Sequence, residues 1–417
     1  MQLSKPVNES YAANVVSLKD TFPLEGLDNL VGARFMGYTA LIPRTYGPGL
    51  YLMFPPETQL SEKFCRENNL YRDSTLNADQ TEKGYAEKNR RVKALKLRGN
   101  VSSCMILPLS SLDYLGIDTN ALKEGDTFDH IGDEKICEKY VIKSADGTPA
   151  AKTKMPKSRV DARLFPLHID SQQWFKHDKE YADKFCIVTQ KIHGVSWRGA
   201  HILVNKNLSL KDKIAKWFGV DVPNQEYALV AGSRKVTKDP NNPNQNHFYK
   251  EDIWSLMLEK VKDAIPRDHI IYGELVGYTP DGAELQKNYT YDAKQGEMKL
   301  YVYRVAQINP DGNLVDYSWD GVKAFCNERG LDYTPELTRC YGSDLSPIVD
   351  HYMNKRYYDE GFRQAIPLSH DKLPDEGICV RAEGIIPSIA KAKAPEFLVH
   401  ESKDLDSGNI DIESEQS

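Results

Sequence analysis

The chain has 417 residues, a length that exceeds one typical domain and accommodates two. Its 40% hydrophobic and 27% charged residues are typical of a globular protein with an apolar core. The net charge of −6 excludes a uniformly basic protein, and the sequence holds no apolar run of about 18 residues that could form a spanning helix. The N-terminal residues also lack the apolar stretch of a secretory signal, so we expect a cytoplasmic protein without membrane contact.

Charge is distributed unevenly along the chain. The segment 401–417 holds six acidic residues and one lysine, which accounts for most of the negative charge. The rest is close to neutral and contains two basic stretches, "KNRRVKALKLR" (88–98) and "KTKMPKSRVDAR" (152–163). Such a stretch is either a solvated face or a site for a phosphate backbone, and the pattern leaves both open. Seven scattered cysteines without a C-x-x-C pair indicate reduced thiols rather than a disulfide framework or a zinc site.

Short β-rich pieces separated by turn residues run from about residue 29 to residue 143. They include "VGARFMGYTALI", "GLYLMF", "RVKALKLRGNVSSCMILPL" and "YVIK". Alternating apolar residues and closely spaced Gly and Pro predict a small antiparallel barrel, so we expect an OB-like nucleic-acid-binding domain over 1–150. The following stretch, 144–165, contains Pro, Gly, Ala and Lys without apolar periodicity and predicts a linker.

The second half of the chain alternates strands with helices. Predicted strands are "FCIVTQ", "AHILVNK", "YALVAGS", "HIIYGELVG", "KLYVYRVAQI", "GICVRAEG" and the run through "KAKAPEFL". Apolar spacing over 253–261 predicts one helix, and "WDGVKAFCNERG", with Gly330 as its stop signal, predicts another. Strands interrupted by separate helices predict an α+β domain over 165–400, followed by an acidic flexible tail over 401–417.

Five short motifs follow one another in this second half. Each motif alone is weak, but the ordered set resembles motifs I, III, IIIa, IV and V of the covalent nucleotidyltransferase superfamily of ATP-dependent ligases and mRNA capping enzymes. His193, where DNA ligases usually carry Asp, makes the first motif similar to that of RNA ligases. The motifs are "KIHG" (191–194), "YGELVG" (272–277), "KLYVYRV" (299–305), "EGICVR" (376–381) and "KAKAPEFL" (391–398).

The order of the domains narrows the resemblance. DNA ligases and capping enzymes of this superfamily place an OB barrel after motif V, whereas only 19 residues follow Leu398 here. The β-rich module instead precedes the motifs, and "FPLHIDSQQWF" (165–175) leads into the lysine motif. This arrangement resembles the RNA ligase 5 family, the group of the Deinococcus and Naegleria enzymes. The resemblance implies a ligase-type adenylyltransferase domain, which is unrelated to the ATP-grasp fold.

Lysine is the residue type that this chemistry needs, because a neutral amine attacks the α-phosphate of ATP and expels pyrophosphate. A free lysine has a pKa of about 10.4, so roughly four molecules in ten thousand are neutral at pH 7. Lowering that pKa by about 2–3 would raise the neutral fraction about 100- to 1,000-fold. We predict Lys191 as the nucleophile, with a bound divalent metal and the catalytic cations Lys391 and Lys393 supplying the shift. The two lysines alternate with Ala392, so on a strand they share one face and can both contact phosphate oxygens.

The resemblance also implies roles for two residues on the nucleoside side. Glu274 stands where a strand ends in a Gly-flanked turn and matches the glutamate that accepts hydrogen bonds from ribose hydroxyls. Tyr303 matches the aromatic residue that stacks on adenine, an interaction worth about 1–3 kcal/mol. Tyr301 is the competing stacker, and a tyrosine in the core is the plain alternative. The family's usual Phe-Asp is replaced here by Tyr303-Arg304.

Further residues are assigned to the nucleotide and the metal by the same resemblance. Glu376 matches the carboxylate that holds the water shell of the metal, and Mg²⁺ keeps several waters in such sites. His193 is the second residue assigned to the metal. It stands where DNA ligases usually carry Asp, so the resemblance does not fix whether it holds the metal's waters. Arg234 in "AGSRKV" fits the arginine that contacts a phosphate or a 3′-OH end. Arg198 and Gln190 complete the predicted cofactor-binding set.

The sequence therefore predicts a monomeric ATP-dependent RNA ligase that uses Mg²⁺ or Mn²⁺ and acts on RNA. It would seal 5′-phosphate and 3′-OH ends, such as nicks in duplex RNA or RNA/DNA, through a lysyl–AMP and an adenylylated 5′ end. A capping-type transferase that uses GTP is one alternative, and a catalytically silent protein that binds RNA ends is another. His168 is either structural or faces nucleic acid, and the sequence leaves both open.

Overall fold

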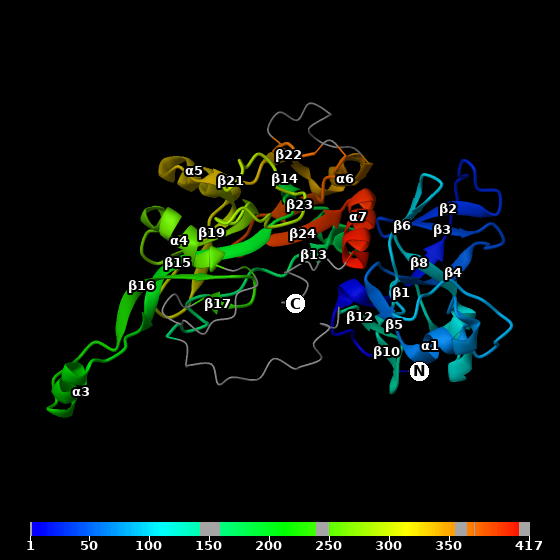
Figure 1. Cartoon of the computed structure of the whole chain (residues 1–417), viewed down its shortest axis with the longest axis horizontal. Helices are drawn as coiled ribbons and strands as arrows, with labels where there is room; N and C mark the ends of the chain where they lie inside the picture. The colour runs from blue at the N-terminus through cyan, green and yellow to red at the C-terminus, as the bar shows by residue number, and fades with distance from the viewer. Residues whose placement is uncertain are drawn as a thin grey trace. The chain divides into compact units, whose positions relative to one another are not determined.

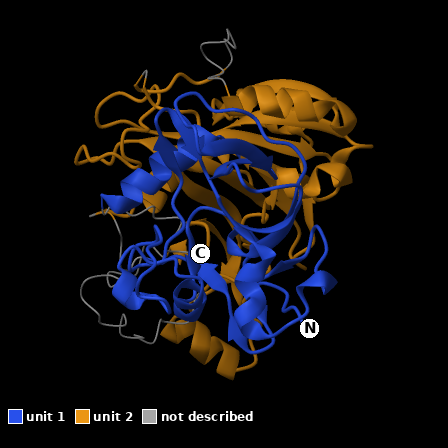
Figure 2. Cartoon of the chain, turned by 90° about the vertical axis from the view of Figure 1, so that its right-hand side faces the viewer, with its two compact units in different colours: residues 1–142, 393–410 blue, residues 143–392, 411–417 orange. Residues whose placement is uncertain are grey.

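The computed structural model describes residues 2–141, 159–238, 249, 251–354, 365–370 and 372–407. The chain divides into two compact units: unit 1 comprises Met1–Ile142 and Lys393–Ile410, and unit 2 comprises Lys143–Ala392 and Asp411–Ser417 (Figure 2). Most of the predicted linker and of the basic stretch 152–163 lies outside the described residues. Unit 1 therefore contains a C-terminal segment in addition to the N-terminal module.

Unit 1 consists mainly of antiparallel β-structure (Figure 1). One sheet has the strand order β8-β4-β1-β9, and the pairs β2–β3, β5–β12, β6–β7 and β10–β11 are separate from it. Strands β9 to β12 have only two or three residues, too few to extend the ladder, and the described residues form no closed barrel. The strands are β1 (Ala13–Leu18), β2 (Leu30–Phe35), β3 (Tyr38–Pro43), β4 (Gly49–Phe54), β5 (Thr58–Leu60), β6 (Leu95–Leu97), β7 (Asn100–Ser102), β8 (Met105–Pro108), β9 (Thr127–Phe128), β10 (His130–Ile131), β11 (Glu134–Lys135) and β12 (Cys137–Lys139).

Two α-helices belong to unit 1, α1 (Glu62–Glu67) and α7 (Pro395–Asp406). Helix α7 corrects two expectations, because "PEFL" is helical rather than extended and the acidic tail is ordered as far as Ser407. Proline at the first helical position starts the helix, since its missing N–H would be unpaired there in any case. Leu398 and Val399 then pack against Ala94. Residues 408–417 lie outside the described residues.

The basic stretch 88–98 is tied to this helix. Arg91 is 1% exposed, and its Nη2 donates to the carbonyl of Ser402 at 2.8 Å. Its guanidinium also lies 3.3 Å from a carboxylate oxygen of Glu57 and 3.0 Å from one of Asp406. A buried guanidinium paired in this way is not available to an RNA backbone. Neither of the two interpretations left open for this stretch, a solvated face or a phosphate site, therefore applies to Arg91.

Lys93 and Lys96 show the same pairing at the surface of unit 1. Lys93 Nζ lies 2.8 Å from Glu87 and 3.0 Å from Asp406, and Lys96 Nζ lies 2.8 Å from Glu396. Both acids Asp406 and Glu396 belong to α7. The basic stretch and the acidic C-terminal helix therefore neutralise each other, which a charge count along the sequence does not reveal.

Unit 2 contains two sheets. One has the order β13-β24-β23-β14-β22, and the other has the order β17-β16-β15-β18-β19-β20, with β21 paired to β19. The strands are β13 (Gln172–Gln173), β14 (Phe185–Lys191), β15 (Val195–Asn205), β16 (Gln225–Gly232), β17 (Thr237–Lys238), β18 (His269–Gly277), β19 (Met298–Ile308), β20 (Leu314–Asp316), β21 (Asp332–Tyr333), β22 (Glu336–Tyr341), β23 (Gly377–Ala382) and β24 (Ser388–Lys393). The helices are α2 (Trp174–His177), α3 (Leu210–Trp217), α4 (Ile253–Val261), α5 (Trp319–Arg329) and α6 (Leu345–Asn354).

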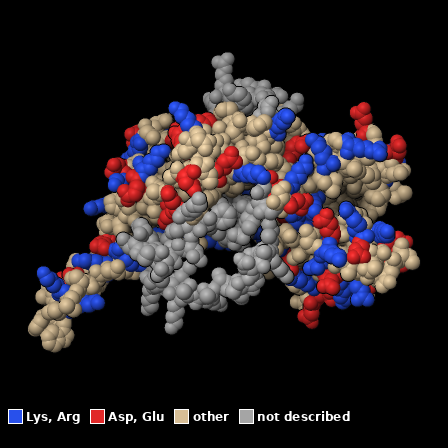
Figure 3. All heavy atoms as spheres, in the orientation of Figure 1, with Lys and Arg blue, Asp and Glu red and all other residues tan. Residues whose placement is uncertain are grey.

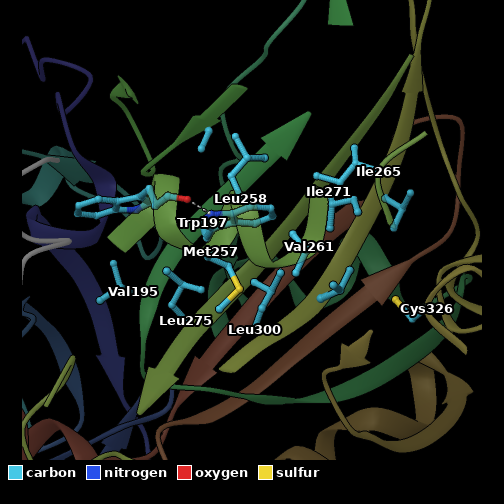
Figure 4. Packing of buried hydrophobic residues seen from close by; sticks show 14 of the residues in the cluster. Val195, Trp197, Met257, Leu258, Val261, Ile265, Ile271, Leu275, Leu300 and Cys326 are labelled. Atoms are coloured by element: carbon cyan, nitrogen blue, oxygen red, sulfur yellow. Dashed lines mark hydrogen bonds between the residues drawn. The ribbon is translucent and has the colours of Figure 1, made fainter. Parts of the chain in front are cut away.

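The two predicted helices of unit 2 are confirmed and cover one face of the larger sheet. Helix α5 ends at Gly330, which adopts a left-handed conformation with φ of 65°. Met257 of α4 packs in a cluster with Trp197 of β15 and Leu275 of β18 (Figure 4). The indole N–H of Trp197 donates to the carbonyl of Trp254 at 3.0 Å, so this large buried side chain is also satisfied as a donor. Of the residues described next, Glu274 and Tyr303 belong to β18 and β19 of this sheet, whereas Lys191 and Lys391 belong to β14 and β24 of the smaller sheet.

Candidate active site

Lys191 is the last residue of β14, where the strand pairs with β23. Its Cα partner on β23 is Gly377, so the side chain of the preceding residue, Glu376, lies beside it. The ammonium Nζ is 2.7 Å from Oε1 of Glu376. The Lys191 side chain is 21% exposed and that of Glu376 is 3% exposed. The site therefore presents a reachable amine against a buried carboxylate.

The turn after Lys191 is held by three residues from other parts of unit 2. The N–H of His193 donates to the hydroxyl of Tyr291 at 2.7 Å, and the N–H of Gly194 donates to Oε1 of Glu274 at 3.2 Å. Gln286 donates from its amide to the carbonyl of Gly194 at 2.9 Å. Burial raises the pKa of Tyr291 well above its usual value, so its hydroxyl stays neutral and can accept this bond. These contacts fix the direction in which Lys191 leaves the strand.

Gly194 is required by close approach rather than by its φ angle. A Cβ placed on it would lie 2.3 Å from the carbonyl oxygen of Leu275 and 2.7 Å from Cγ of Glu274. Any side chain here would push the lysine turn away from β18, which carries Glu274. The glycine of "KIHG" thus lets Lys191 and the predicted ribose-binding glutamate lie in one site.

Four predicted site residues gather around Cys379 of β23. The pKa of this thiol is raised by burial, and Lys191, Glu376, Lys391 and Glu274 all exert Coulomb forces on it. Cys379 is paired with Thr189 across the ladder, two residues before the nucleophile. Charges that act together on one small side chain must lie near it. The structure therefore brings the motif I lysine, the two glutamates and the first motif V lysine together.

The two motif V lysines alternate on β24 as predicted, with buried Ala392 between them. Lys391 is opposite Gln173 of the parallel strand β13. Lys393 is where unit 1 resumes, and its Nζ lies 2.8 Å from Oε1 of Glu401 on α7. Its ammonium also lies 5.3 Å from the ring centre of Phe397. The Glu401 partner could not be foreseen from the motif, because the helix that carries it was expected to be a strand followed by a flexible tail.

Tyr303 lies at an irregularity of the β18–β19 ladder. Tyr272 pairs with Arg304 and Gly273 pairs with Val302, so Tyr303 is the extra residue of a bulge. Its hydroxyl is 2.5 Å from Nδ1 of His168. A bulge re-aims a side chain relative to the regular pleat, which sets Tyr303 apart from the neighbouring core residues.

His168, the hydrogen-bond partner of Tyr303, is an uncharged histidine. Burial, followed by the charges of Arg198, Arg234 and Arg304, lowers its pKa to about 3. The imidazole is therefore neutral at pH 7, with one ring nitrogen engaged by Tyr303 and the other buried. The structure places His168 inside unit 2 next to Tyr303 rather than on an outer surface.

The remaining predicted stacker and its neighbour are engaged inside the protein. The hydroxyl of Tyr301 donates to Asp292 at 2.6 Å, and burial together with that carboxylate raises its pKa. Arg304, which replaces the family's usual Asp, is buried, pairs with Asp316 and lies 4.4 Å over the ring of Tyr272. Where the family usually has the aspartate of Phe-Asp, this chain thus has an arginine that forms an internal ion pair.

Two predicted nucleotide-binding residues use their polar groups inside the protein. Gln190 is buried, and its amide both donates to and accepts from the backbone of Ile366, at 3.1 Å and 2.8 Å. Arg198 is buried as well, and donates to the carbonyls of Ser233, Phe165 and Pro166 at 3.0, 2.6 and 3.0 Å. Burial lowers the pKa of Arg198 to about 10, so it remains charged at neutral pH. We therefore assign neither residue to the nucleotide.

Arg234 is partly exposed, and its Nη2 lies 3.9 Å from a carboxylate oxygen of the exposed Asp170. His193 points its Nδ1 toward Oε2 of Glu376 at 3.9 Å, and its ring packs edge-on against Tyr289 at 4.8 Å between centres. In the described part of the chain, no three His, Cys, Asp or Glu side chains gather as a metal-binding group. Any metal here would therefore rely on few protein ligands.

Comparison with known proteins identifies the family. Residues 184–393, about half of the chain, match the sequence profile described as RNA ligase. This protein belongs to the RNA ligase family. The predicted enzyme class is confirmed, and the matched segment runs from just before β14 to the last residue of β24. No curated protein matches the sequence.

Solved structures of the Naegleria gruberi RNA ligase share the fold. The one with PPi matches with a TM-score of 0.57 and 13% identity, covering 95% of this chain and 100% of that chain. A lysine-to-alanine variant with ATP and Mn matches with a TM-score of 0.54 and 13% identity over the same shares. A glutamate-to-alanine variant with AMP and Mn gives 0.55 and 12% identity, again over 95% and 100%. The predicted ligase-type α+β fold is therefore confirmed.

The described helices include none that is both long and apolar enough to span a membrane.

Proposed function

We propose that the protein is an ATP-dependent RNA ligase that joins a 5′-phosphate end to a 3′-OH end. The observation that carries this proposal is the pairing of Lys191 with Glu376 at 2.7 Å, at a turn held by Glu274. An amine at the end of β14, a carboxylate just before β23 and a second glutamate on β18, in a chain of the RNA ligase family, form a set suited to nucleotidyl transfer.

In the first step Nζ of Lys191 bonds to the α-phosphorus of ATP, and the bond from that phosphorus to the bridging oxygen breaks. Pyrophosphate leaves with the electron pair. The amine must be neutral to attack, whereas the carboxylate of Glu376 at 2.7 Å favours the ammonium form. The geometry thus represents a resting state, and Glu376 has to release Lys191 before the attack.

A hydrated Mg²⁺ or Mn²⁺ fits the residues around Glu376. The carboxylate is 3% exposed and is paired with Nζ of Lys191, so once Lys191 is released a buried anion would need a replacement cation. Glu376 would hold such an ion through its waters, with His193 beside it, since Mg²⁺ takes few carboxylates and keeps several waters. The ion would supply positive charge next to the α-phosphate.

The other residues position the substrate. We propose that Glu274 accepts hydrogen bonds from the ribose hydroxyls, that Tyr303 stacks on adenine, and that Lys391 and Lys393 contact phosphate oxygens. Arg234 would contact a phosphate or a 3′-OH end. These roles require the side chains to reach one common site. The charges of Lys191, Lys391 and Glu274 all act on the thiol of Cys379, which supports such a site.

In the second step the AMP passes from Lys191 to an RNA 5′-phosphate, whose oxygen attacks the phosphorus while the P–N bond breaks. In the third step the 3′-OH attacks the 5′-phosphate, and AMP departs. In such transfers the protein mainly positions groups and neutralises charge. We propose nicks in duplex RNA or RNA/DNA as substrates, with the β-rich module of unit 1 serving as an RNA-binding module of a monomeric enzyme.

The test uses ATP or GTP labelled at the α-phosphate, with Mg²⁺ or Mn²⁺, followed by unlabelled nicked duplex RNA. We expect a protein-bound label with ATP, which moves to the RNA 5′ end and appears as free AMP when the nick is sealed. Label from GTP alone would identify a capping-type transferase. Binding of RNA ends without any protein-bound label would identify a catalytically silent protein and would overturn the proposal.

A further inference from the structure

Helix α3 is located at the tip of the long hairpin formed by β15 and β16, at the lower left of Figure 1. Strand β15 starts four residues after Lys191 and has 11 residues, so at about 3.3 Å per residue it extends about 35 Å from the lysine turn. A capping box starts the helix: the side chain of Ser209 accepts from the N–H of Asp212, whose carboxylate accepts from the N–H of Ser209. The helix is thus a formed element held away from the site.

The apolar face of α3 is uncovered. Leu210, Ile214, Trp217 and Phe218 follow the spacing i, i+4, i+7 and i+8, which places them on one side of the helix. Trp217 is 81% exposed and Phe218 is 71% exposed, and the other two are exposed as well. Large apolar residues grouped on one exposed face are typical of a binding surface, whereas single exposed ones are ordinary.

The charges around this face are mainly positive. Segment 205–221 holds four lysines and two aspartates, and Lys211 and Lys213 are both exposed. Blue spheres of basic residues flank the tip at the lower left of Figure 3. The rings of Trp217 and Phe218 lie edge to face, 4.8 Å between centres. Exposed aromatic rings beside lysines match the two features of a single-stranded nucleic acid, which are base faces and phosphates.

We propose that the α3 tip binds unpaired RNA at a distance from the ends being joined, with Trp217 and Phe218 stacking on bases and Lys211 and Lys213 contacting phosphates. This inference rests on the proposed function for its ligand, and it adds a second RNA contact that none of the five motifs contains. Two copies of this positive tip would repel each other. Eight residues are also short for a helix that lies in a lipid surface.

The test compares three variants of the full chain. Trp217→Ala/Phe218→Ala removes the stacking pair, and Lys211→Ala/Lys213→Ala removes two charges. Phe185→Ala/Tyr341→Ala is the matched control, because these two exposed rings also lie edge to face, 5.4 Å apart, at the far end of β14. The readouts are the Kd for a fluorescent single-stranded RNA at several salt concentrations, the yield of lysyl–AMP, and sealing of RNA ends with short or long unpaired arms.

The two tip variants should fail in different ways. Loss of one stacked base should weaken RNA binding between about 5- and 150-fold without changing the slope of log affinity against log salt. Loss of the lysines should flatten that slope by about 0.7 for each phosphate contact. Lysyl–AMP yield should stay at the wild-type level in both, and so should sealing of short arms, which cannot extend about 35 Å.

Unchanged RNA affinity in the Trp217→Ala/Phe218→Ala variant would overturn the inference. So would a variant that loses binding to vesicles of anionic lipid, or loses a wild-type dimer, while keeping its RNA affinity. If the wild type forms no lysyl–AMP, the proposed function fails instead, and RNA affinity still reports on α3 by itself.

Discussion

Two cation–carboxylate clusters, one in each unit, share their residue types and differ in what surrounds them. In unit 1 the side chain of Arg91 is 1% exposed, and its guanidinium lies against Glu57 and Asp406. In unit 2 the side chain of Lys191 is 21% exposed, and its ammonium lies 2.7 Å from Glu376. The first cluster is enclosed by protein, whereas the second opens at the end of a strand.

The difference shows how one fold separates stabilising charges from reacting ones. Arginine stays protonated and offers several donors in a rigid fork, so Arg91 can connect the N-terminal module to α7 at any ordinary pH. A lysine ammonium can lose its proton when its surroundings change. Exposure and the identity of the cation, rather than the presence of an ion pair, therefore distinguish the buried Arg91 cluster from the Lys191 cluster that we propose to be catalytic.

The largest effect on stability is expected from Arg91→Ala. It leaves the buried Glu57 without its cation and removes a hydrogen bond to Ser402, so the free energy of unfolding should fall by about 3–5 kcal/mol. Urea denaturation measures this loss, and lysyl–AMP formed per folded molecule should stay unchanged. Lys96→Ala is the control, because its partly exposed pair with Glu396 is worth about 1 kcal/mol or less. Equal losses for both variants would contradict the structural role of Arg91.

Glu376→Gln should slow lysyl–AMP formation, the activity that Arg91→Ala should leave unchanged. The carboxylate that pairs with Lys191 and would hold the hydrated cation becomes neutral, so adenylylation should slow by about 10- to 100-fold. The rate should also need a higher Mg²⁺ or Mn²⁺ concentration to reach half its maximum. Single-turnover labelling at a series of metal concentrations measures both effects, and a metal dependence identical to wild type would remove Glu376 from the metal site.

The raised pKa of Glu57 predicts that the stability of unit 1 depends on pH. Burial raises its pKa to about 7, above its usual value of 4.5, although Arg91 acts in the opposite direction. The folded state therefore holds this proton more tightly, and the stability it contributes is present below about pH 4.5 and is lost as the pH rises through 7. Unfolding free energies should fall in this window by up to about 1.4 kcal/mol per pH unit more steeply in wild type than in Glu57→Gln. Parallel curves would contradict this assignment.

The smallest effects concern the partner of the second motif V lysine. Glu401 holds Lys393 at 2.8 Å, so Glu401→Gln should release this lysine for phosphate and lower the half-saturating ATP concentration by up to about fivefold. Lys393→Ala should raise that concentration and lower the adduct yield. Opposite signs for the two variants are the expected result, and a change in the same direction would mean that Glu401 only supports the fold of α7.

Much of the site could be predicted because the motifs are local. Strand β18 coincides with the predicted "HIIYGELVG", and the alternation of Lys391 with Lys393 required only the pleat of a strand. Tyr291 and Gln286 were missed because they contact the lysine turn from about a hundred residues along the chain. Nothing in their own neighbourhood marks them.

Charge patterns were less reliable for the same reason. The partner of Arg91 is Ser402, 311 residues later, and only the folded chain brings α7 to the basic stretch. Helix α3 did carry a local signal, since Ser209 and Asp212 form a capping box ahead of an apolar stripe, and this signal was missed. Local chemistry can be predicted from sequence, whereas the partners of isolated charges depend on tertiary contacts.

The central claim is that Lys191 is the nucleophile, and one measurement tests it most directly. Wild type, Lys191→Ala and Lys191→Arg are incubated with ATP labelled at the α-phosphate and a divalent metal, and the protein-bound label is measured after denaturation in detergent at neutral pH and mapped to a residue. We expect label on Lys191 in the wild type and none on either variant, because the guanidinium remains protonated and cannot attack. Label that persists on Lys191→Ala, or that maps to another lysine in the wild type, would contradict the account.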